Sequence, residues 1–214
     1  MKITLLCDNK DSWIIKYLDE IYNKLISLGH EVFKVSNYKD IKEGELCFLL
    51  SCENIMPAKY LKLNKHNLVI HESDLPKGKG WSPLTWQILE GKNEIPITLF
   101  EAEAKVDTGL IYLQDKIEFE GYELNKELKH KQGLKTKELI LGFVKQYPEI
   151  LNKGRQPKGK STYYPKRSPD DSEIDIDKTI REQFNLLRVV DNERYPAFFK
   201  INGEKYYLKI YKED

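Results

Sequence analysis

Apolar and polar positions alternate in blocks along the first half of the chain, and the blocks have the lengths of strands and helices. Residues 2–7 form a short apolar run that is typical of a buried strand. From residue 13 to residue 28, apolar side chains recur at helical spacing, so one face of a helix can pack against a sheet. Residues 31–35 and 45–50 are again strand-like. The chain therefore opens with a predicted strand–helix–strand unit.

The next hundred residues continue this alternation. A short helix is predicted at residues 57–63, a β-branched strand at 68–70 and a helix at 84–89. Extended stretches follow at 97–102 and 110–119, before a long helix begins near Asn125. Strands that alternate with helices favour parallel pairing through helical crossovers. We therefore predict an α/β fold with an open, mainly parallel sheet and helices on both faces.

The remaining sequence has a different character. Residues 152–168 are rich in Lys, Arg, Gly, Pro and Tyr and lack apolar periodicity, as expected of a connecting segment. A helix is predicted at 176–190, and a hairpin at 197–210 turns around an Asn-Gly pair. The chain thus divides into a main domain, residues 1–150, and a connecting segment with a small C-terminal helix-and-hairpin appendage, residues 151–214.

Composition and charge limit the partners and the cell compartment that we expect for the protein. Lys and Arg total 35 against 34 for Asp and Glu, a net charge of +1, so no general field attracts nucleic acid or an anionic membrane. No apolar run approaches the length of a membrane span, and the first residues resemble a buried strand more than an export signal. The three cysteines lack metal-ligand spacing and are expected to be reduced and buried. We predict a cytoplasmic protein.

Two polar residues follow predicted strands, where the loops of an α/β sheet converge on a ligand. His71 comes directly after residues 68–70, and a neutral imidazole can accept or donate a proton near neutral pH. Asp107 lies in an Asp-Thr-Gly turn after residues 97–102, and it could orient that imidazole and stabilise its protonated form. Each residue also has an ordinary explanation, because a lone His is often a structural hydrogen-bonding residue and Asp is common in turns.

The order of the residues in this region is more specific. The sequence reads His71-Glu72-Ser73-Asp74-Leu75-Pro76, then Lys79-Gly80 and Pro83, and Asp107-Thr108-Gly109 begins 36 positions after the histidine. This pattern resembles the folate-dependent formyltransferase family, whose loop is Asn-x-His-x-Ser-x-Leu-Pro, followed by a basic residue and Gly, a Pro and later Asp-x-Gly. The resemblance is good over residues 45–120. It implies a Rossmann-like catalytic domain that transfers a formyl group from 10-formyltetrahydrofolate to an amine.

The resemblance also implies roles for individual residues. His71 would stabilise the oxyanion and help to move protons, and Asp107 would hold His71 in position. Because the formyl donor is already activated, neither a metal ion nor a covalent enzyme intermediate is expected. The folate co-substrate is expected against two strand-end loops, at Ser51, Cys52, Asn54, Met56, Ala104 and Val106.

One position departs from the family pattern. The Asn two residues before the histidine is replaced by Val69, whose side chain cannot donate a hydrogen bond. Loss of one oxyanion donor can cost about 3 to 4 kcal/mol of transition-state stabilisation. Another donor is therefore expected, and the candidates are Ser51, Cys52, Asn54 and a main-chain amide.

The residues from Tyr163 onward indicate which class of molecule accepts the formyl group. Tyr163-Tyr164-Pro165, Arg167 and the acidic residues after Pro169 resemble the segment that follows the catalytic domain in formyltransferases acting on nucleotide-linked amino sugars. Such an acceptor would explain basic and aromatic residues near the cleft, because guanidinium groups match phosphates and aromatic rings stack on bases. The candidate acceptor-binding residues are Ser73, Lys77, Lys79, Trp81, Tyr164 and Arg167.

The leading hypothesis is a sugar N-formyltransferase whose partner is a nucleotide-linked amino-deoxy sugar. Two alternatives stay open: a hydrolase that releases formate from the same donor, and a folate- or nucleotide-sugar-binding protein that has lost turnover through Val69. Transfer RNA is disfavoured as the acceptor, because the net charge is only +1 and the tail is short for grasping a large RNA. The hairpin at 197–210 could add to a partner's sheet in a homodimer.

Overall fold

A central sheet of six strands forms the body of the protein, in a computed structural model that describes residues 1–103 and 106–213. The first four strands of the sheet pair in parallel, whereas the last two run antiparallel to their neighbours. The mostly parallel sheet is thus confirmed, and it carries an antiparallel edge. In sheet order the strands are β2 (Glu31–Val35), β1 (Lys2–Leu6), β3 (Gly44–Leu49), β4 (Asn64–His71), β6 (Glu94–Glu101) and β7 (Ile111–Glu118).

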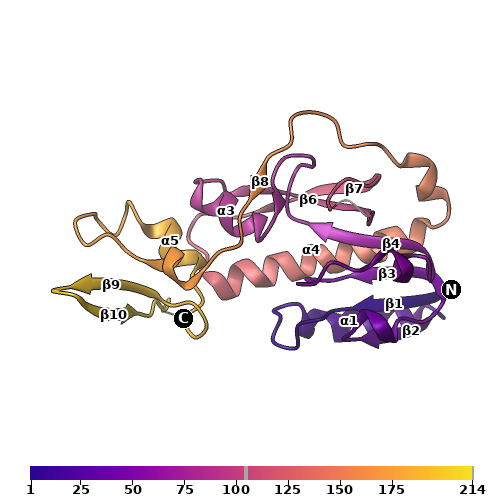
Figure 1. Ribbon diagram of the computed structural model, residues 1–214, viewed down its shortest axis with the longest axis horizontal. Coiled ribbons are helices and arrows are strands. Elements are labelled where there is room, and N and C mark those ends of the chain that lie inside the picture. The colour runs from indigo at the N-terminus through magenta and orange to yellow at the C-terminus, as the bar shows by residue number, and fades with distance from the viewer. Residues whose placement is uncertain (104–105, 214) are drawn as a thin grey trace.

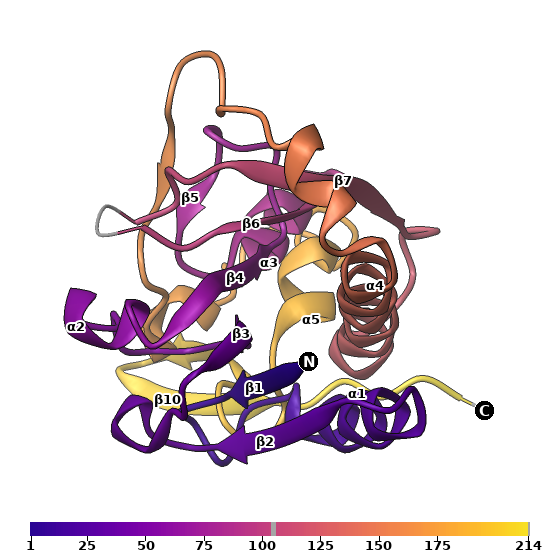
Figure 2. The ribbon, with the colours of Figure 1, turned by 90° about the vertical axis from the view of Figure 1, so that its right-hand side faces the viewer.

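Helices lie on both faces of this sheet, as the alternating pattern predicts (Figure 2). The long helices α1 (Ile15–Ser27) and α4 (Asn125–Gln146) cover one face, which we call the α4 face. The short helix α2 (Ala58–Leu61) lies on the other face with the single turn at Tyr38–Asp40. A further helix, α3 (Pro83–Leu89), follows the loop after β4. The Rossmann-like α/β fold is confirmed.

The main core fills the space between the sheet and the α4 face. Phe48 of β3 meets Phe143 of α4 edge to face, with ring centroids 6.2 Å apart, and both side chains are fully buried. Burial of an aromatic or aliphatic side chain of this size stabilises the fold by about 1.5 to 3 kcal/mol. The apolar stripe of α4 therefore packs in this core. No helix among the described residues is long and apolar enough to cross a membrane.

A small appendage extends from one end of the sheet (Figure 1). The chain leaves α4 through the turn at Glu149–Lys153 and crosses above the sheet, where β8 (Tyr163–Tyr164) pairs with β5 (Lys79–Gly80). Residues 156–168, which we call the strap, thereby cover the loop after β4. The appendage then contains the turn Pro169–Ser172, helix α5 (Phe184–Val189) and the hairpin of β9 (Ala197–Ile201) and β10 (Glu204–Leu208).

The hairpin prediction is confirmed, but the helix predicted at residues 176–190 is wrong over its first half. Only Phe184–Val189 is helical, and the side chains of Ile176 and Ile180 are 58 % and 60 % exposed. The side chain of Gln183 bonds both the amide and the carbonyl of Asp175, at 2.7 and 2.9 Å. Side-chain bonds to the main chain compete with helix formation, so apolar spacing alone did not decide the structure here.

A buried ion pair ties the appendage to the main domain. Arg188 of α5 donates to a carboxylate oxygen of Glu123 at 3.1 Å, and the two side chains are 1 % and 3 % exposed. Burial acts to raise the pKa of Glu123, but hydrogen bonds from Lys131 and from the Glu120 and Gly121 amides outweigh it and lower the pKa to about 2. Removing Arg188 would leave a buried carboxylate with one fewer partner.

We predict that Arg188→Met lowers the free energy of unfolding by about 3 kcal/mol, because the carboxylate of Glu123 loses its buried guanidinium partner. Denaturant unfolding measures the change. Lys200→Met is the matched control, since Lys200 pairs with Glu173 at 3.1 Å on the surface and such pairs contribute at most about 1 kcal/mol. Equal losses in the two variants would contradict a special role for the buried pair.

Candidate active site

His71 is the last residue of β4, and the alternation of the strand decides which way it faces. Leu68 and Ile70 pack on the α4 face, whereas Val69 packs on the opposite face. Because side chains two apart along a strand share a face, His71 lies on the side of Val69. The imidazole is 8 % exposed, so it sits where the sheet ends but is not free in solvent.

The imidazole is held by the loop that follows it. His71 Nε2 lies 2.8 Å from the carbonyl oxygen of Gly78. A carbonyl oxygen can only accept, so Nε2 carries the proton and Nδ1 is left with the lone pair in the neutral ring. The amide of Gly78 in turn donates to Thr162 Oγ1 of the strap at 2.8 Å. The orientation of His71 therefore depends on residues 72–80 and on the strap above them.

Asp107 approaches His71 by a different route from the one that the sequence suggested. Strand β6 runs antiparallel to β4, so its end at Glu101 lies beside Leu68, three residues short of His71. Asp107, which lies between β6 and β7, is nevertheless beside the imidazole, and it has a left-handed φ of 55°. Left-handed conformations of residues other than Gly are costly and cluster at functional sites.

The carboxylate of Asp107 lies close to the imidazole without a hydrogen bond between them. Asp107 Oδ2 is 3.9 Å from His71 Nε2, and both side chains are about nine-tenths buried. The same oxygen accepts a bond from the Gly80 amide at 3.1 Å. The hydrogen bond from Gly80 to this carboxylate fixes the loop that follows β4. The predicted pair of His71 and Asp107 is thus brought together, with Gly78 and Gly80 as the direct hydrogen-bond partners.

A cavity of about 660 Å³ opens around the ends of β3 and β4 and includes both residues in its wall. One half, which we call the loop half, lies between the loop after β3 and the loop before Asp107. The other, which we call the helix half, lies between the end of β4, helix α4 and the appendage. His71 lines the cavity at the end of β4. Pockets of about 300 to 1,000 Å³ are typical of small-molecule sites.

The residues predicted to hold folate gather on the loop half. Its wall includes Ser51, Cys52, Asn54, Met56 and Val106, whereas Ala104 lies outside the described residues. The carboxylate of Asp8 accepts bonds from the Glu53 and Asn54 amides, each at 2.8 Å, and so fixes the loop after β3.

The residues predicted to hold an acceptor are divided. Trp81 and Arg167 line the cavity, whereas Ser73, Lys77, Lys79 and Tyr164 are not among its lining residues. Ser73 is 1 % exposed, and its carbonyl accepts a bond from Thr98. Tyr164 stacks on Trp86 with ring centroids 6.1 Å apart and donates to Glu90 at 2.7 Å. Ser73 and Tyr164 therefore hold the loop and the strap in the structure, and a role for these four residues in binding the acceptor stays a prediction.

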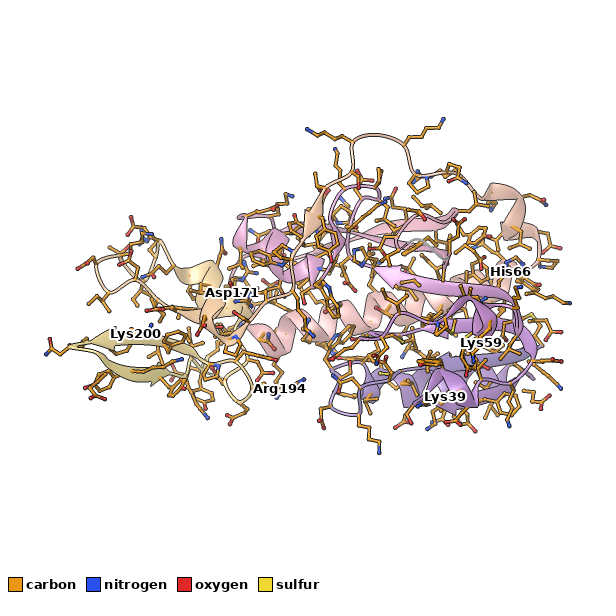
Figure 3. The ribbon with its side chains drawn as sticks, in the orientation of Figure 1. Lys39, Lys59, His66, Asp171, Arg194 and Lys200 are labelled. Atoms are coloured by element: carbon orange, nitrogen blue, oxygen red, sulfur yellow. The ribbon has the colours of Figure 1, made fainter. Side chains whose placement is uncertain are left out.

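Sequence reasoning missed most of the helix half. Four polar residues of α4 line it at helical spacing, and the signal was present as a polar stripe on an otherwise apolar helix. Four residues come from the appendage, and one of them, Arg194, lies where the appendage meets the body of the molecule (Figure 3). Trp13 precedes α1. The missed polar and aromatic residues of this half include Trp13, Glu72, Asn125, Lys129, Gln132, Thr136, Asp191, Arg194 and Tyr195.

A polar network links α4 to the residue after His71. Gln132 donates to a carboxylate oxygen of Glu72 at 2.7 Å and accepts from Lys129 Nζ at 3.0 Å. Lys129 Nζ also lies 5.1 Å from the ring centroid of Trp13, over its face. Burial lowers the pKa of Lys129, although Glu72 and Asp191 act in the opposite direction. The network places the ammonium of Lys129 beside the ring of Trp13 and the side-chain amide of Gln132 in the wall of the cavity.

Within residues 1–103 and 106–213, no three His, Cys, Asp or Glu side chains gather as metal ligands. The cysteines also have the character of buried thiols. Burial raises the pKa of Cys47 to about 12, and it raises the pKa of Cys52 as well. Neither thiol is therefore prepared as a thiolate nucleophile.

Comparison with known proteins gives a family match and several relatives. The sequence matches the family described as "Formyl transferase" over residues 25–141, more than half of the chain. It is 28 % identical over 145 residues to a methionyl-tRNA formyltransferase of Thermodesulfovibrio yellowstonii, covering 67 % of this chain and 47 % of that protein. It is 30 % identical over 178 residues to a GDP-perosamine N-formyltransferase of Brucella melitensis, covering 78 % and 64 %. The chain spans about half the length of the first curated relatives it matches.

Solved structures share the fold over the whole chain. A methionyl-tRNA formyltransferase from Clostridium thermocellum superposes with a TM-score of 0.79 at 22 % identity, covering 100 % of this chain and 94 % of that one. HypX from Aquifex aeolicus, solved in complex with tetrahydrofolic acid, superposes with a TM-score of 0.74 at 17 % identity, covering 98 % of this chain and 37 % of that one. At these identities the likeness concerns the fold alone.

We predict that Gly80→Ala destabilises the protein by about 2 kcal/mol more than Gly159→Ala. Both glycines have positive φ, 96° and 115°, so both alanines are strained. Only at Gly80 would the new Cβ meet another residue, 2.4 Å from the carbonyl oxygen of Tyr164, whereas nothing lies within 4 Å at Gly159. Thermal and denaturant unfolding measure the difference. Equal destabilisation would show that the strap does not press on this loop.

Proposed function

The chain belongs to the formyl transferase family, and we propose that it is an N-formyltransferase that moves a formyl group from 10-formyltetrahydrofolate to the amine of a nucleotide-linked amino-deoxy sugar. The observation that carries this proposal is that His71 and Asp107, 3.9 Å apart, line one cavity at the end of β4. In the proposed reaction the two substrates meet at this imidazole.

The loop half suits the flat ring system of a folate. Met56, Val69 and Ala102 supply apolar surface to this half of the cavity, and Met56 is 7 % exposed. The loop that Asp8 fixes offers main-chain groups that could read the polar edge of a ring. Flat heteroaromatic ligands are held in this way, by apolar walls with a few fixed polar groups.

The proposed reaction needs proton movement and charge stabilisation. The acceptor nitrogen forms a bond to the formyl carbon, an oxyanion develops, and the bond to the folate nitrogen then breaks. The acceptor amine loses a proton and the leaving nitrogen gains one. His71 Nδ1 is the ring nitrogen able to take a proton, because Nε2 already donates to Gly78. The neighbouring carboxylate of Asp107 would stabilise the imidazolium while the proton is held.

The helix half has features that fit a nucleotide-linked sugar. Lys129 and Arg194 provide cations from two elements, and Trp13 provides an aromatic face. Ammonium and guanidinium groups bind phosphate oxygens, and aromatic rings stack on bases or pack against sugar rings. The carboxylates of Glu72 and Asp191 in the same half are suitable acceptors for sugar hydroxyls or for an amine.

An acceptor of limited size is supported over transfer RNA. The strap and the appendage both contribute to the cavity wall, through Arg167 and Arg194 respectively, so they restrict the approach of a large partner. The net charge of +1 provides little of the phosphate neutralisation on which RNA affinity depends. Relatives named for either acceptor are similarly distant, at 28 % and 30 % identity, so the acceptor must be decided by experiment.

We predict that the purified protein formylates a GDP- or dTDP-linked 4-amino-4,6-dideoxy sugar when it is supplied with 10-formyltetrahydrofolate, as seen by mass spectrometry. His71→Ala should reduce the rate by at least about 100-fold, because the ring supplies general acid and base catalysis. His30→Gln is the matched control, since His30 lies outside the cavity wall.

Three results would contradict this assignment in different ways. Formylation of methionyl-tRNA alone would replace the sugar with RNA as the acceptor. Formate release without any acceptor would support a hydrolase. Binding of tetrahydrofolate without turnover would support a protein that has lost catalysis.

We also predict that Lys129→Met raises KM for the nucleotide-linked sugar by about tenfold or more with little change in kcat, because a charge-assisted hydrogen bond contributes about 1.5 to 3 kcal/mol. Steady-state kinetics with saturating folate provide the test. Lys137→Met is the control, because Lys137 lies on the same helix but pairs with Glu20 outside the cavity. Burial lowers the pKa of Lys129, so its ammonium loses its proton at a lower pH than that of an ordinary lysine. The contribution of Lys129 to binding of the sugar should therefore be lost, as pH rises, at that lower pH. An unchanged KM would exclude Lys129 from acceptor binding.

A further inference from the structure

Among the described side chains at the end of β4 and in Asp107, no donor is free for the oxyanion while the His71 ring is neutral. The Nε2 proton of His71 is already directed to the Gly78 carbonyl at 2.8 Å. Val69, on the same strand face, is apolar, and an ionised Asp107 can only accept. A transfer through a tetrahedral oxyanion needs a hydrogen-bond donor aimed at that oxygen. The donor must therefore come from a neighbouring element of the wall.

The exit of β3 is the adjoining element, and its polar side chains can be compared directly. One N–H of the Asn54 side-chain amide donates to Asp8 at 2.8 Å, and the Cys52 thiol donates to the Leu6 carbonyl at 3.6 Å. Ser51 differs from both, because its Oγ accepts a bond from Ser12 Oγ at 3.0 Å. A hydroxyl that accepts a bond still has its own proton to donate. Ser51 and Asn54 therefore each keep a donor, the hydroxyl proton of Ser51 and the second side-chain N–H of Asn54, but Asn54 is held against Asp8 by its main-chain amide as well as by its side chain.

The register of the sheet places Ser51 next to His71. Leu49 of β3 pairs with Val69 of β4 in parallel, and Ser51 and His71 each come two residues later. Neighbouring strands lie about 4.8 Å apart, so the two side chains begin from adjacent positions at the strand ends. Both residues line the cavity. Ser51 also has a left-handed φ of 53°, a costly conformation that residues other than Gly adopt mainly where the surroundings require it.

We propose that the hydroxyl of Ser51 is the oxyanion donor of this enzyme, and that Ser12 is a positioning residue that orients and polarises it. This inference rests on the proposed formyl transfer. When the acceptor nitrogen bonds to the formyl carbon, the carbonyl π pair moves to oxygen, and Ser51 donates to that oxygen without giving up its proton. The pair returns as the bond to the folate nitrogen breaks, so Ser51 ends the cycle unchanged.

The hydrogen bond between the two hydroxyls lets Ser12 orient and polarise the hydroxyl of Ser51. Ser12 is 8 % exposed, and its Oγ donates to Ser51. Hydrogen bonds in a chain polarise one another, so a hydroxyl that accepts a bond becomes a better donor. Ser12 also limits the rotation of the Ser51 hydroxyl. Its loss should therefore weaken catalysis less than the loss of Ser51 itself.

The decisive variant is Ser51→Gly, because glycine suits the left-handed conformation and removes only the hydroxymethyl group. We expect kcat to fall by about 100-fold, as for other single oxyanion donors, while the unfolding temperature stays the same or rises. Ser12→Ala should reduce kcat by a smaller factor. Ser27→Ala is the matched control, since Ser27 lies at the exposed end of α1 and its hydroxyl bonds only Lys24 among the described residues. It should leave kcat unchanged.

A rescue experiment separates a donor from a merely structural residue. Val69→Asn introduces an amide donor on the strand face of His71. In the Ser51→Gly background it should recover at least about tenfold of the lost kcat, whereas KM for folate stays near its wild-type value. A kcat for Ser51→Gly within twofold of wild type, or an absence of any rescue by Val69→Asn, would overturn the assignment of Ser51.

Two readouts keep the inference separate from the choice of acceptor. The first is formylation of a GDP-linked 4-amino sugar, and the second is release of tetrahydrofolate from 10-formyltetrahydrofolate with water as the acceptor. Both pass through a tetrahedral oxyanion, so the Ser51→Gly defect should appear in whichever reaction the wild type performs. Wild type inactive in both would overturn the proposed function and this inference together. An active wild type with an equally active Ser51→Gly would overturn this inference alone.

Discussion

The hydrogen bond from His71 Nε2 to the carbonyl of Gly78 is the interaction on which the site depends. It decides which nitrogen of the ring carries the proton, and it closes the loop of residues 72–80 against the end of β4. Asp107 holds the same loop by accepting a hydrogen bond from the Gly80 amide. Because both bonds go to main-chain groups, the site requires the backbone of this loop in one conformation. The strap maintains that conformation through Thr162.

The cavity follows from where the parallel strands end. β3 and β4 finish side by side, so the loops beyond them leave space on both faces of the sheet. On one side the loop after β3 and the chain before Asp107 form a wall, and on the other side α4 and the appendage form the second. His71, at the end of β4, is part of the wall of this cavity.

Much of this arrangement was predictable from local pattern. Apolar spacing is a short-range property, and it identified the strands, α4 and the terminal hairpin. The motif that begins at His71, together with its spacing to Asp107, predicted the family. Such a motif can be read from the sequence because the residues of one loop are consecutive. The predicted helix at 176–190 failed because Gln183 bonds the main chain of Asp175, a competition that hydrophobic periodicity does not report. The antiparallel direction of β6 was likewise invisible, since pairing direction depends on the partner strand.

The sequence by itself determined the order of elements, the candidate pair of His71 and Asp107, and the absence of an amide donor at Val69. Only the tertiary structure decided that Lys129 and Arg194 line the same cavity as His71 and Asp107. It also decided that Ser51, Cys52 and Asn54 have different hydrogen-bond partners. The physical reason is that a residue's type sets what its polar groups can bond to, whereas the fold sets which partners are within reach. Asn54 is held against Asp8 through its side chain and its main chain, and the Cys52 thiol is directed to Leu6, whereas Ser51 keeps its hydroxyl proton at the register position of His71.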